Sequence, residues 1–401
     1  MVVSDIVITG MGVISALGCG VEATVDRLIR SESGVGRLRY LKTVHKEIPV
    51  AEVPFSDDDL RKMLGIADGV SITRTSLLGR VALREAVAMG QLKGLGDQRV
   101  AFISGTTVGG MEKSEQFYKD FLENDSRNEY IALHDCGACT DMIGREYTGK
   151  ISMQTTISTA CSSAANAIIY GADLLRTGRA DLVIAGGTEC LSKFHLDGFN
   201  TLMILDNEPC KPFDKNRHGL NLGEGAAYVV MESREHAEQR GVQPICQLTG
   251  YANRCDAYHQ TASSPEGEGA FRAMQAALQS AQLQPGDIDY INAHGTGTPN
   301  NDESEGKAMM RVFGDKVPLV SSTKAYTGHP TSAAGAIESV ISILALTRNF
   351  VPANLNFSEK IDSLNFTPVT QVLTDVELKH VLCNSFGFGG NDSSCIFSKI
   401  S

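Results

Sequence analysis

The stretch STACSSAANAI, at residues 158–168, decides the fold, because a near-repeat of it, YTGHPTSAAGAI, occurs at residues 326–337. Each copy is typical of a strand end followed by a helix of small residues. Two further pairs occur in the same order: FISGTTVGG (102–110) with INAHGTGTP (291–299), and VIAGGTE (183–189) with CNSFGFGGN (383–391). Three pairs in one order favour an internal duplication over a chance likeness of glycine-rich turns.

Strand-like and helical segments alternate along both halves. Short β-branched runs followed by glycine predict buried strands, and apolar residues at three- and four-residue spacing predict helices. The expected strands cover residues 5–9, 100–104, 151–158, 181–185, 227–231, 289–293, 317–321, 380–384 and 394–397. The expected helices cover residues 76–89, 162–177, 269–281 and 334–347. Together they indicate an α/β fold, which the repeats divide into residues 1–240 and residues 241–401.

The composition is that of a folded protein with an acidic balance. The chain has 401 residues, with 36 Lys plus Arg, 47 Asp plus Glu and a formal net charge of −11. A nucleic-acid partner is not expected, because phosphate binding needs a basic surface. No apolar run approaches the roughly 20 residues of a membrane span, and residues 1–13 show no secretory signal. We therefore expect a cytoplasmic protein without membrane contact, whose ten cysteines are mostly reduced and buried.

One cysteine differs from the other nine. Cys161 lies in TACSSAA (159–165), where the predicted strand ends and the predicted helix begins. The free amides of a helix N-terminus stabilise a thiolate and lower the pKa of the thiol. The same amides can stabilise the oxyanion of a thioester under attack. Cys161 is therefore the candidate nucleophile, and the alternative is the buried, inert role that fits most of the others.

Two histidines are candidate partners of Cys161. His294 (in AHGTGTP) and His329 (in KAYTGH) both follow predicted strands, and His329 matches Cys161 in the repeat. Functional groups of layered α/β folds gather at the carboxyl ends of strands, so the three side chains could converge on one pocket. Lys324 and Glu338 are candidates for a buried pair that orients an imidazole, and the alternative is a surface charge for each.

A second cysteine motif, HDCGAC, places Cys136 and Cys139 at C-x-x-C spacing. This spacing occurs in redox dithiols and in half of a zinc site. No second cysteine pair at metal spacing follows in the sequence, and no clear strand precedes the motif. We therefore interpret it as helix or interface packing, with redox or metal binding as the alternative.

Residues 151–190, 292–305, 324–338 and 384–391 together resemble the condensing enzymes of the thiolase fold. More closely, the chain resembles the elongating β-ketoacyl-acyl carrier protein synthases of fatty acid and type II polyketide synthesis, over nearly its whole length. A cysteine, HGTGT, KxxxxGH and a GFGG loop carry the resemblance in combination. It implies a thiolase fold of two duplicated halves in five layers, α-β-α-β-α, with the nucleophile in the first half and both histidines in the second. The second histidine, His329, is typical of the decarboxylating, elongating members.

The resemblance also implies a role for each site residue. Cys161 would take the acyl chain from the phosphopantetheine thioester of an acyl carrier protein. His294 and His329 would stabilise the enolate that forms as malonyl-carrier protein loses carbon dioxide, so that no metal or redox cofactor is needed. The remaining assignments are Cys161 and Phe388 for an oxyanion hole, Phe388 with Gly387 and Gly389 for a gate, and Thr296 and Thr298 for pantetheine binding.

Three departures from the family pattern bear on specificity and docking. Asn391-Asp392 follows the GFGG loop where Thr-Asn is usual, and Val108 stands where isoleucine often lies near the acyl pocket. The smaller side chain of Val108 would admit a longer or stiffer acyl group. Carrier proteins are acidic, yet the stretch 69–75 keeps a single basic residue. The candidate docking residues are Arg61, Lys62, Arg74, Lys113 and Lys119.

The favoured function is therefore decarboxylative elongation of a fatty acid or polyketide/polyene chain, by a homodimer or a heterodimer. One alternative is a ketosynthase subunit that is active only in a heterodimer with a chain-length-factor-like partner. A second, from a different class, is a cysteine thioester hydrolase or acyltransferase, which would use Cys161 with one histidine. A third is a non-catalytic subunit that shapes a partner's pocket, against which the presence of Cys161 argues.

Overall fold

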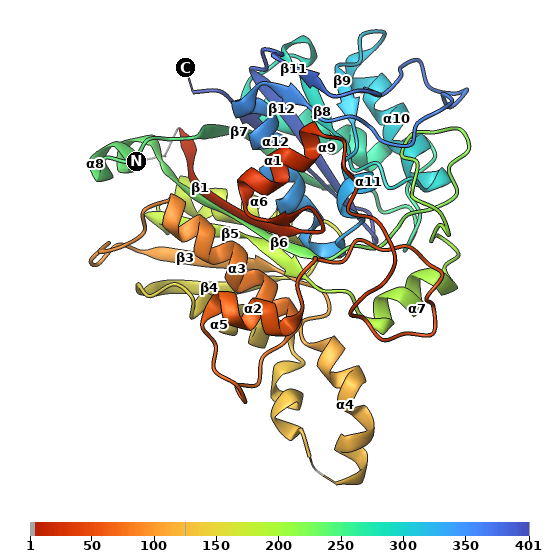
Figure 1. Ribbon diagram of the computed structural model, residues 1–401. Helices are drawn as coiled ribbons and strands as arrows, with labels where there is room; N and C mark the ends of the chain where they lie inside the picture. Colours follow the sequence, from red (N-terminus) through yellow and green to blue (C-terminus); the bar gives the residue numbers. More distant parts are fainter. Residues whose placement is uncertain (1–4, 125, 401) are drawn as a thin grey trace.

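The computed structural model describes residues 5–124 and 126–400, and a mixed sheet runs through its centre (Figure 1). The strands of the first half are β1 (Ile6–Ser15), β2 (Gly18–Cys19), β3 (Val100–Gly105), β4 (Ile151–Ile157), β5 (Leu182–Glu189) and β6 (Gly225–Ser233). The strands of the second half are β7 (Cys246–Cys255), β8 (Tyr290–Asn292), β9 (Leu319–Ser321), β12 (His380–Gly387) and β13 (Asn391–Ser398). A separate pair consists of β10 (Phe350–Val351) and β11 (Leu373–Thr374).

Both halves pair their strands in the same way. The spatial order is β4-β3-β5-β6-β1 in the first half and β9-β8-β12-β13-β7 in the second. In each half the second strand of this order pairs in parallel with both neighbours, and the remaining two pairings are antiparallel. The two sheets join where β1 meets β7, through the pairs Val7–Gln247 and Ile8–Cys246. The duplication expected from the repeated motifs is therefore also present in the order of the strands.

Helices form three layers around the two sheets (Figure 1). The longer ones are α3 (Arg74–Met89), α4 (Met111–Glu123), α6 (Ser163–Arg176), α9 (Glu268–Ala281), α10 (Pro299–Phe313) and α12 (Ala334–Arg348). The shorter ones are α1 (Val21–Ile29), α2 (Asp57–Leu64), α5 (Cys136–Gly144), α7 (Lys193–Thr201), α8 (Arg234–Arg240), α11 (Lys324–Thr327) and the 3-10 turns η1 (Asn128–Leu133), η2 (Pro285–Asp287) and η3 (Thr331–Ala333).

The layers follow from which helix packs on which sheet. Helix α3 covers the outer face of the first half, α6 and α12 lie between the halves, and α9 with α10 covers the outer face of the second. All residues of α12 from Ala334 to Leu346 are buried, because the helix contacts β6 on one side and β12 on the other. The five-layered α-β-α-β-α arrangement is thereby confirmed.

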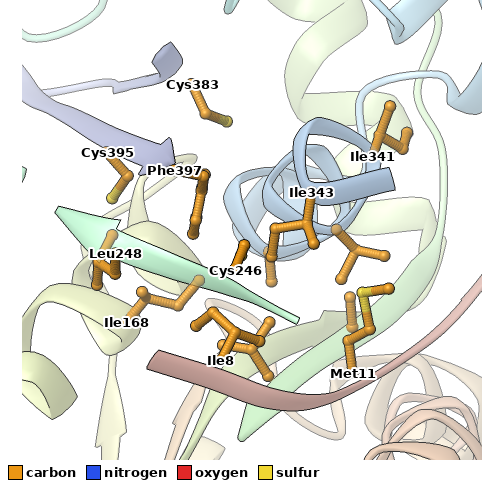
Figure 2. Packing of buried hydrophobic residues seen from close by; sticks show 14 of the residues in the cluster. Ile8, Met11, Ile168, Cys246, Leu248, Ile341, Ile343, Cys383, Cys395 and Phe397 are labelled. Carbon is orange, nitrogen blue, oxygen red and sulfur yellow. The ribbon is translucent and has the colours of Figure 1, made fainter. Parts of the chain in front are cut away.

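The central layer supplies the main hydrophobic core. Side chains from α6, α12 and strands of both halves meet there, and Figure 2 shows Ile168, Ile343, Ile8 and Phe397 converging in it. Three of the ten cysteines, Cys246, Cys383 and Cys395, belong to this cluster as small buried residues (Figure 2). They fill space in the core, as the sequence predicted for most of the cysteines.

All nine expected strands and all four expected helices are present, several with longer bounds. The longest strand that the sequence analysis missed is β7, whose sequence CQLTGYANRC contains no apolar run to mark it. Its pairing with β13 and β1 supplies the stability that its own residues do not signal. Among the described helices, none has the length and apolar character needed to cross a membrane.

The C-x-x-C motif lies on α5. Cys139 is buried, with its Sγ 3.5 Å from Oγ1 of Thr73, while Cys136 begins the helix and is half-buried. Burial raises the pKa of Cys136 to about 11 and that of Cys139 to about 12. Both thiols are therefore protonated near neutral pH, and the contact of Cys139 with Thr73 agrees with the interpretation as helix packing.

Candidate active site

Cys161 lies in a tight turn between β4 and α6. Ala160, just before it, has a left-handed backbone with φ of 51°, a conformation that side chains other than glycine rarely adopt. Ser163 stabilises the turn, since its hydroxyl accepts from the Thr159 amide at 2.9 Å and donates to the Ala160 carbonyl at 2.6 Å. The strained turn places Cys161 directly ahead of the first turn of the helix, as the sequence predicted.

The electrostatics of Cys161 differ from the sequence expectation of a lowered pKa. Burial raises the pKa of its thiol to about 11, against the opposing effects of the Lys324 charge and of the backbone N–H groups of Phe388 and Cys161. Burial prevails because the side chain is almost fully removed from water. The resting nucleophile is therefore a thiol, and a nearby base must take its proton.

His329 lies where that base is needed. Its Nε2 is 3.0 Å from Sγ of Cys161, and burial together with the Lys324 and His195 charges holds the pKa of the imidazole well below its usual range. Among the described residues, its Nδ1 is buried without a hydrogen-bond partner. The imidazole is therefore neutral, and no partner fixes which of its nitrogens carries the proton.

His294 lies beside His329, with the two ring centroids 5.4 Å apart and the planes at 86°. Lys324 lies behind it: Nζ is 3.3 Å from Nδ1 of His294, and it also donates to the His294 carbonyl and to Glu338. An ammonium group only donates, so Nδ1 of His294 accepts and its Nε2 carries the proton. Burial and the Lys324 charge keep this imidazole neutral by holding its pKa well below its usual range.

The predicted Lys324–Glu338 pair is present and buried. Both side chains are 1% exposed, and Nζ lies 2.5 Å from Oε1. Burial raises the pKa of Glu338 to about 7 although the Lys324 charge opposes that shift. Since Lys324 also contacts His294, the pair lies at the position that the predicted orienting role requires, and the surface-charge alternative for both residues is wrong.

Two further carboxylates support the site, and the sequence analysis did not identify either. Glu305 of α10 accepts the His294 and Gly295 amides at 2.9 Å and 2.8 Å, which fixes the backbone of the HGTGT turn. Glu189, at the end of β5, accepts from Thr106, Thr107 and Ser332, and so ties the loop after β3 to the turn before α12. Both residues lie in segments that the sequence analysis named, 292–305 and 183–189. The sequence does not show which distant groups their carboxylates contact.

A cavity of about 330 Å³ opens onto Cys161, His294 and His329. Gly387, Phe388, Gly389, Thr296 and Thr298 also line it. The Oγ1 atoms of Thr296 and Thr298 lie 2.9 Å apart at this wall. Val108, by contrast, is buried at 6% exposure in the loop after β3 and does not line the cavity, whereas the other predicted contact residues do.

The residue predicted to act as a gate, Phe388, makes an aromatic contact. The Phe388 ring stacks on Phe199 of α7, with centroids 5.8 Å apart and planes at 21°, and both rings line the cavity. The gate loop is hydrogen-bonded to the segment after β7, from Gly389 N–H to Gln260 O at 2.8 Å and from Asp256 N–H to Gly390 O at 2.8 Å. A movement of the loop that carries Phe388 would therefore break these hydrogen bonds and the contact with Phe199.

Two of the five candidate docking residues are already occupied. Arg74 is buried and pairs with Glu224 and Asp57, and Lys113 pairs with the same Asp57 at 3.3 Å. These charges serve an internal network and are not available to a partner, so the prediction is wrong for both. Lys62 and Lys119 are exposed, and Arg61 donates to the Val70 carbonyl at 2.8 Å.

Family models match most of the chain. Residues 3–237 match the N-terminal domain of β-ketoacyl synthase, and residues 245–358 match its C-terminal domain. A curated relative, 3-oxoacyl-[acyl-carrier-protein] synthase 2 of Vibrio harveyi, is 32% identical, with 98% of each chain covered. The corresponding protein of Staphylococcus aureus strain N315 is also 32% identical, again with 98% of each chain covered.

Solved structures agree in fold. The ishigamide ketosynthase/chain length factor has a TM-score of 0.91 at 29% identity, covering 99% of this chain and 100% of the other. A type II polyketide synthase acyl-carrier protein in complex with its ketosynthase matches with a TM-score of 0.88 at 26% identity, covering 99% and 100%. The fold is therefore the thiolase fold expected from the sequence.

Proposed function

The chain belongs to the β-ketoacyl synthase family of acyltransferases, and on that premise we propose that Cys161, His294 and His329 carry its condensation reaction. The reaction joins an acyl group held on the enzyme to malonyl-carrier protein with loss of carbon dioxide, and so elongates a fatty acid or a polyketide/polyene chain. One observation supports the assignment most: Sγ of Cys161 and the two imidazoles face one cavity, with Sγ 3.0 Å from Nε2 of His329.

Acyl transfer begins with the protonated thiol. As Sγ of Cys161 attacks the incoming thioester carbonyl, the thiol proton passes to Nε2 of His329 and then to the departing pantetheine sulfur. The backbone N–H groups of Cys161 and Phe388, which act to lower the pKa of the thiol, stabilise the tetrahedral oxyanion. The products are an S-acyl Cys161 and a free carrier thiol.

Decarboxylation then uses the same two histidines as donors. Nε2–H of His294, fixed by the Lys324 contact, donates to the malonyl thioester carbonyl. His329 donates in its Nε2–H form, because no residue that the structure describes accepts a proton from its Nδ1. Breaking the carboxyl carbon–carbon bond leaves its electron pair in the enolate. The enolate carbon attacks the acyl carbonyl, and the Cys161 thiolate leaves.

The residues of the cavity would hold no cofactor of their own in this reaction. We propose that the phosphopantetheine arm of an acyl carrier protein enters along Thr296 and Thr298, whose hydroxyls line the cavity. The carrier is the expected partner, and the protein is expected to form a homodimer, or a heterodimer with a related ketosynthase-like subunit. The roles of Gly387 and Gly389 in the gate and of Val108 near the acyl pocket are predictions from the sequence.

The central test is Cys161→Ala, in which the nucleophile is removed and the histidines are kept. Intact-mass measurement after incubation with acyl-carrier protein should show no acyl-enzyme, whereas release of carbon dioxide from malonyl-carrier protein should continue. His294→Ala should lose that release. The matched control is Cys19→Ala, which removes an exposed thiol that does not line the cavity and should be acylated like the wild type.

Two outcomes would contradict the assignment, and a third would decide the oligomeric form. Chain elongation by Cys161→Ala would remove the cysteine from the reaction. Steady release of free acid without carbon dioxide would instead identify a thioester hydrolase. Activity that appears only after co-purification with a second ketosynthase-like chain would identify the heterodimeric form, which the chain length factor in a similar structure makes a specific candidate.

A further inference from the structure

The loop that carries Phe388 is the tip of a β-hairpin. Strands β12 and β13 pair as far as Gly387 and Asn391. The connection between them consists of three residues, Phe388, Gly389 and Gly390, and both of these glycines have left-handed backbones, with φ of 82° and 74°. Because the connection is so short, the base of the hairpin decides where the backbone N–H of Phe388 is held.

The base of the hairpin is in direct contact with the turn that holds Cys161. A Cβ atom at Gly387 would lie 2.9 Å from the Thr159 carbonyl and 3.0 Å from Oγ of Ser162, so a larger residue would push the two backbones apart. Ser385, two residues earlier on β12, donates to the Cys161 carbonyl at 3.2 Å. Strand β12 therefore packs closely on the turn that carries the nucleophile.

Asn391, on strand β13, makes the second contact with this turn. Three donors surround its Oδ1: the hydroxyl of Ser162 at 2.9 Å, and the side-chain amides of Asn166 and Asn253, each at 2.7 Å. If this oxygen turned away, donors in a largely buried cluster would lose their acceptor, which costs free energy. Asn391 therefore fixes the start of β13 to the nucleophile turn, to α6 and to β7.

The two backbone N–H groups of the proposed oxyanion hole lie on opposite sides of this contact. The Cys161 amide belongs to the turn, directly before Ser162. The Phe388 amide belongs to the hairpin, three residues before Asn391. Donors of an oxyanion hole stabilise the developing charge only when they are held in place before the reaction. The contacts between hairpin and turn therefore set the geometry on which acyl transfer depends.

We propose that Asn391 is a positioning residue for acyl transfer, which holds the Phe388 amide at the oxyanion through its contact with Ser162. This inference rests on the proposed function, because it assumes that Cys161 accepts an acyl group through a tetrahedral oxyanion. Decarboxylation uses the two histidines instead, and in the part of the chain that the structure describes neither is hydrogen-bonded to Asn391. The residue therefore acts on the first step and not on the second.

The test compares two changes of the same side chain. Asn391→Leu has nearly the same size but no acceptor, whereas Asn391→Asp keeps oxygens that accept from the same donors. Adjacent side chains of a strand point to opposite faces, so the new carboxylate would lie on the face opposite to Asp392. Acylation of Cys161 by hexanoyl-pantetheine is followed by intact mass. Its maximal rate should fall roughly tenfold or more in Asn391→Leu, with little change in KM, and return to near the wild-type value in Asn391→Asp.

Release of carbon dioxide from malonyl-carrier protein is the second readout, and it should stay at the wild-type rate in both variants. Ser162→Ala removes the contact from the other side and should slow acylation in the same way, which provides the test if Asn391→Leu does not fold. The matched control is Ser393→Ala, which removes a hydroxyl bonded to Asn166 and Asn253 in the same cluster but not to the turn. It should keep both rates.

Three results would overturn the proposal. The first is a wild-type acylation rate in Asn391→Leu and Ser162→Ala. The second is an equal loss of acylation and of carbon dioxide release, which would assign Asn391 a structural role only. The third is an Asn391→Asp variant as slow as Asn391→Leu. A wild-type enzyme that neither becomes acylated nor releases carbon dioxide would instead contradict the proposed function.

Discussion

The reactive cysteine shows how burial can reverse an expectation based on local geometry. A helix N-terminus lowers the pKa of a thiol, but full burial of Cys161 outweighs it and raises that pKa to about 11. The consequence is a neutral thiol beside a neutral imidazole, in which charge develops only as the acyl donor arrives. A site of this kind protects its nucleophile from oxidation while the substrate is absent.

At the scale of single residues, Asp392 makes the stability of the protein depend on pH. Its carboxylate is buried near Asp256 and Glu305, and burial with the Asp256 charge raises its pKa to about 8. Arg254, opposite Asp392 across the β7–β13 pairing, donates to the Asn253 carbonyl instead. Because the folded pKa exceeds the unfolded one, this group's contribution to stability is lost as pH rises, by at most about 1.4 kcal/mol per pH unit.

We therefore expect Asp392→Asn to have a higher free energy of unfolding than the wild type near pH 8, with the difference vanishing near about pH 4. Urea unfolding at a series of pH values would measure it. Asp315→Asn, which replaces an exposed carboxyl, is the control and should leave the pH dependence unchanged. Equal curves for wild type and Asp392→Asn would contradict the buried, proton-binding carboxyl.

Single residues of the site were predictable where the chemistry is rare in the sequence. Cysteine and histidine are uncommon residue types, so Cys161, His294 and His329 had few competing candidates. Their positions directly after predicted strands indicate that they lie at the same edge of the sheet. Glu305 and Glu189 were missed because acidic residues are common, and nothing in the sequence states which amide a carboxylate will accept. Phe199 was missed because its contact with Phe388 joins segments that are far apart in the chain.

At the scale of elements, β1 and α3 approach unusually closely. A side chain at Gly12 would place its Cβ 2.1 Å from the Ala82 carbonyl, and one at Gly10 would place it 2.6 Å from the Ala86 carbonyl. Both contacts are with helix backbone, which cannot move aside without shifting α3. The two glycines therefore set the distance between the outer helix layer and the first sheet.

Gly12→Ala should consequently lower the free energy of unfolding by about 2–3 kcal/mol or more, because α3 must move away from β1. Chemical denaturation would measure the loss. Gly198→Ala is the matched control: this exposed position in α7 has open space around it, so alanine should stabilise the helix by up to about 1 kcal/mol. Similar effects of the two changes would contradict the close packing of α3 on β1.

The elements that the sequence predicted are those with a strong local pattern. Strands β3, β5 and β6 are buried and apolar, and they were recognised from that alone. Strand β7 combines Gly, Asn, Gln and Thr, so only its partners identify it. The same is true of α10, whose polar sequence PNNDESEGK gives no clear apolar periodicity.

At the scale of the molecule, the two repeats share one core. Helix α12 is buried over thirteen consecutive residues, and side chains from both halves form the cluster around it. The five-layer order was predictable from the repeated motifs together with the family resemblance. How closely the two halves pack was not predictable from the sequence, because the packing depends on how the two sheets meet at β1 and β7.

We expect the whole chain to unfold in a single transition, since neither half can cover α12 alone. Calorimetry and far-UV circular dichroism should give the same midpoint for residues 1–401. Residues 1–240 and residues 241–401, produced separately, should show no cooperative transition. A cooperative transition from either half alone would contradict the shared core and would support two independent domains.

The contact between Cys161 and His329 has an evolutionary consequence. The two residues occupy corresponding positions in the two repeats, each between the edge strand of its half, β4 or β9, and a central helix, and they meet across the boundary at 3.0 Å. Identical copies would have placed the same residue type at both positions. A thiol that faces an imidazole therefore became possible only after the copies diverged, so this chemistry arose from broken symmetry.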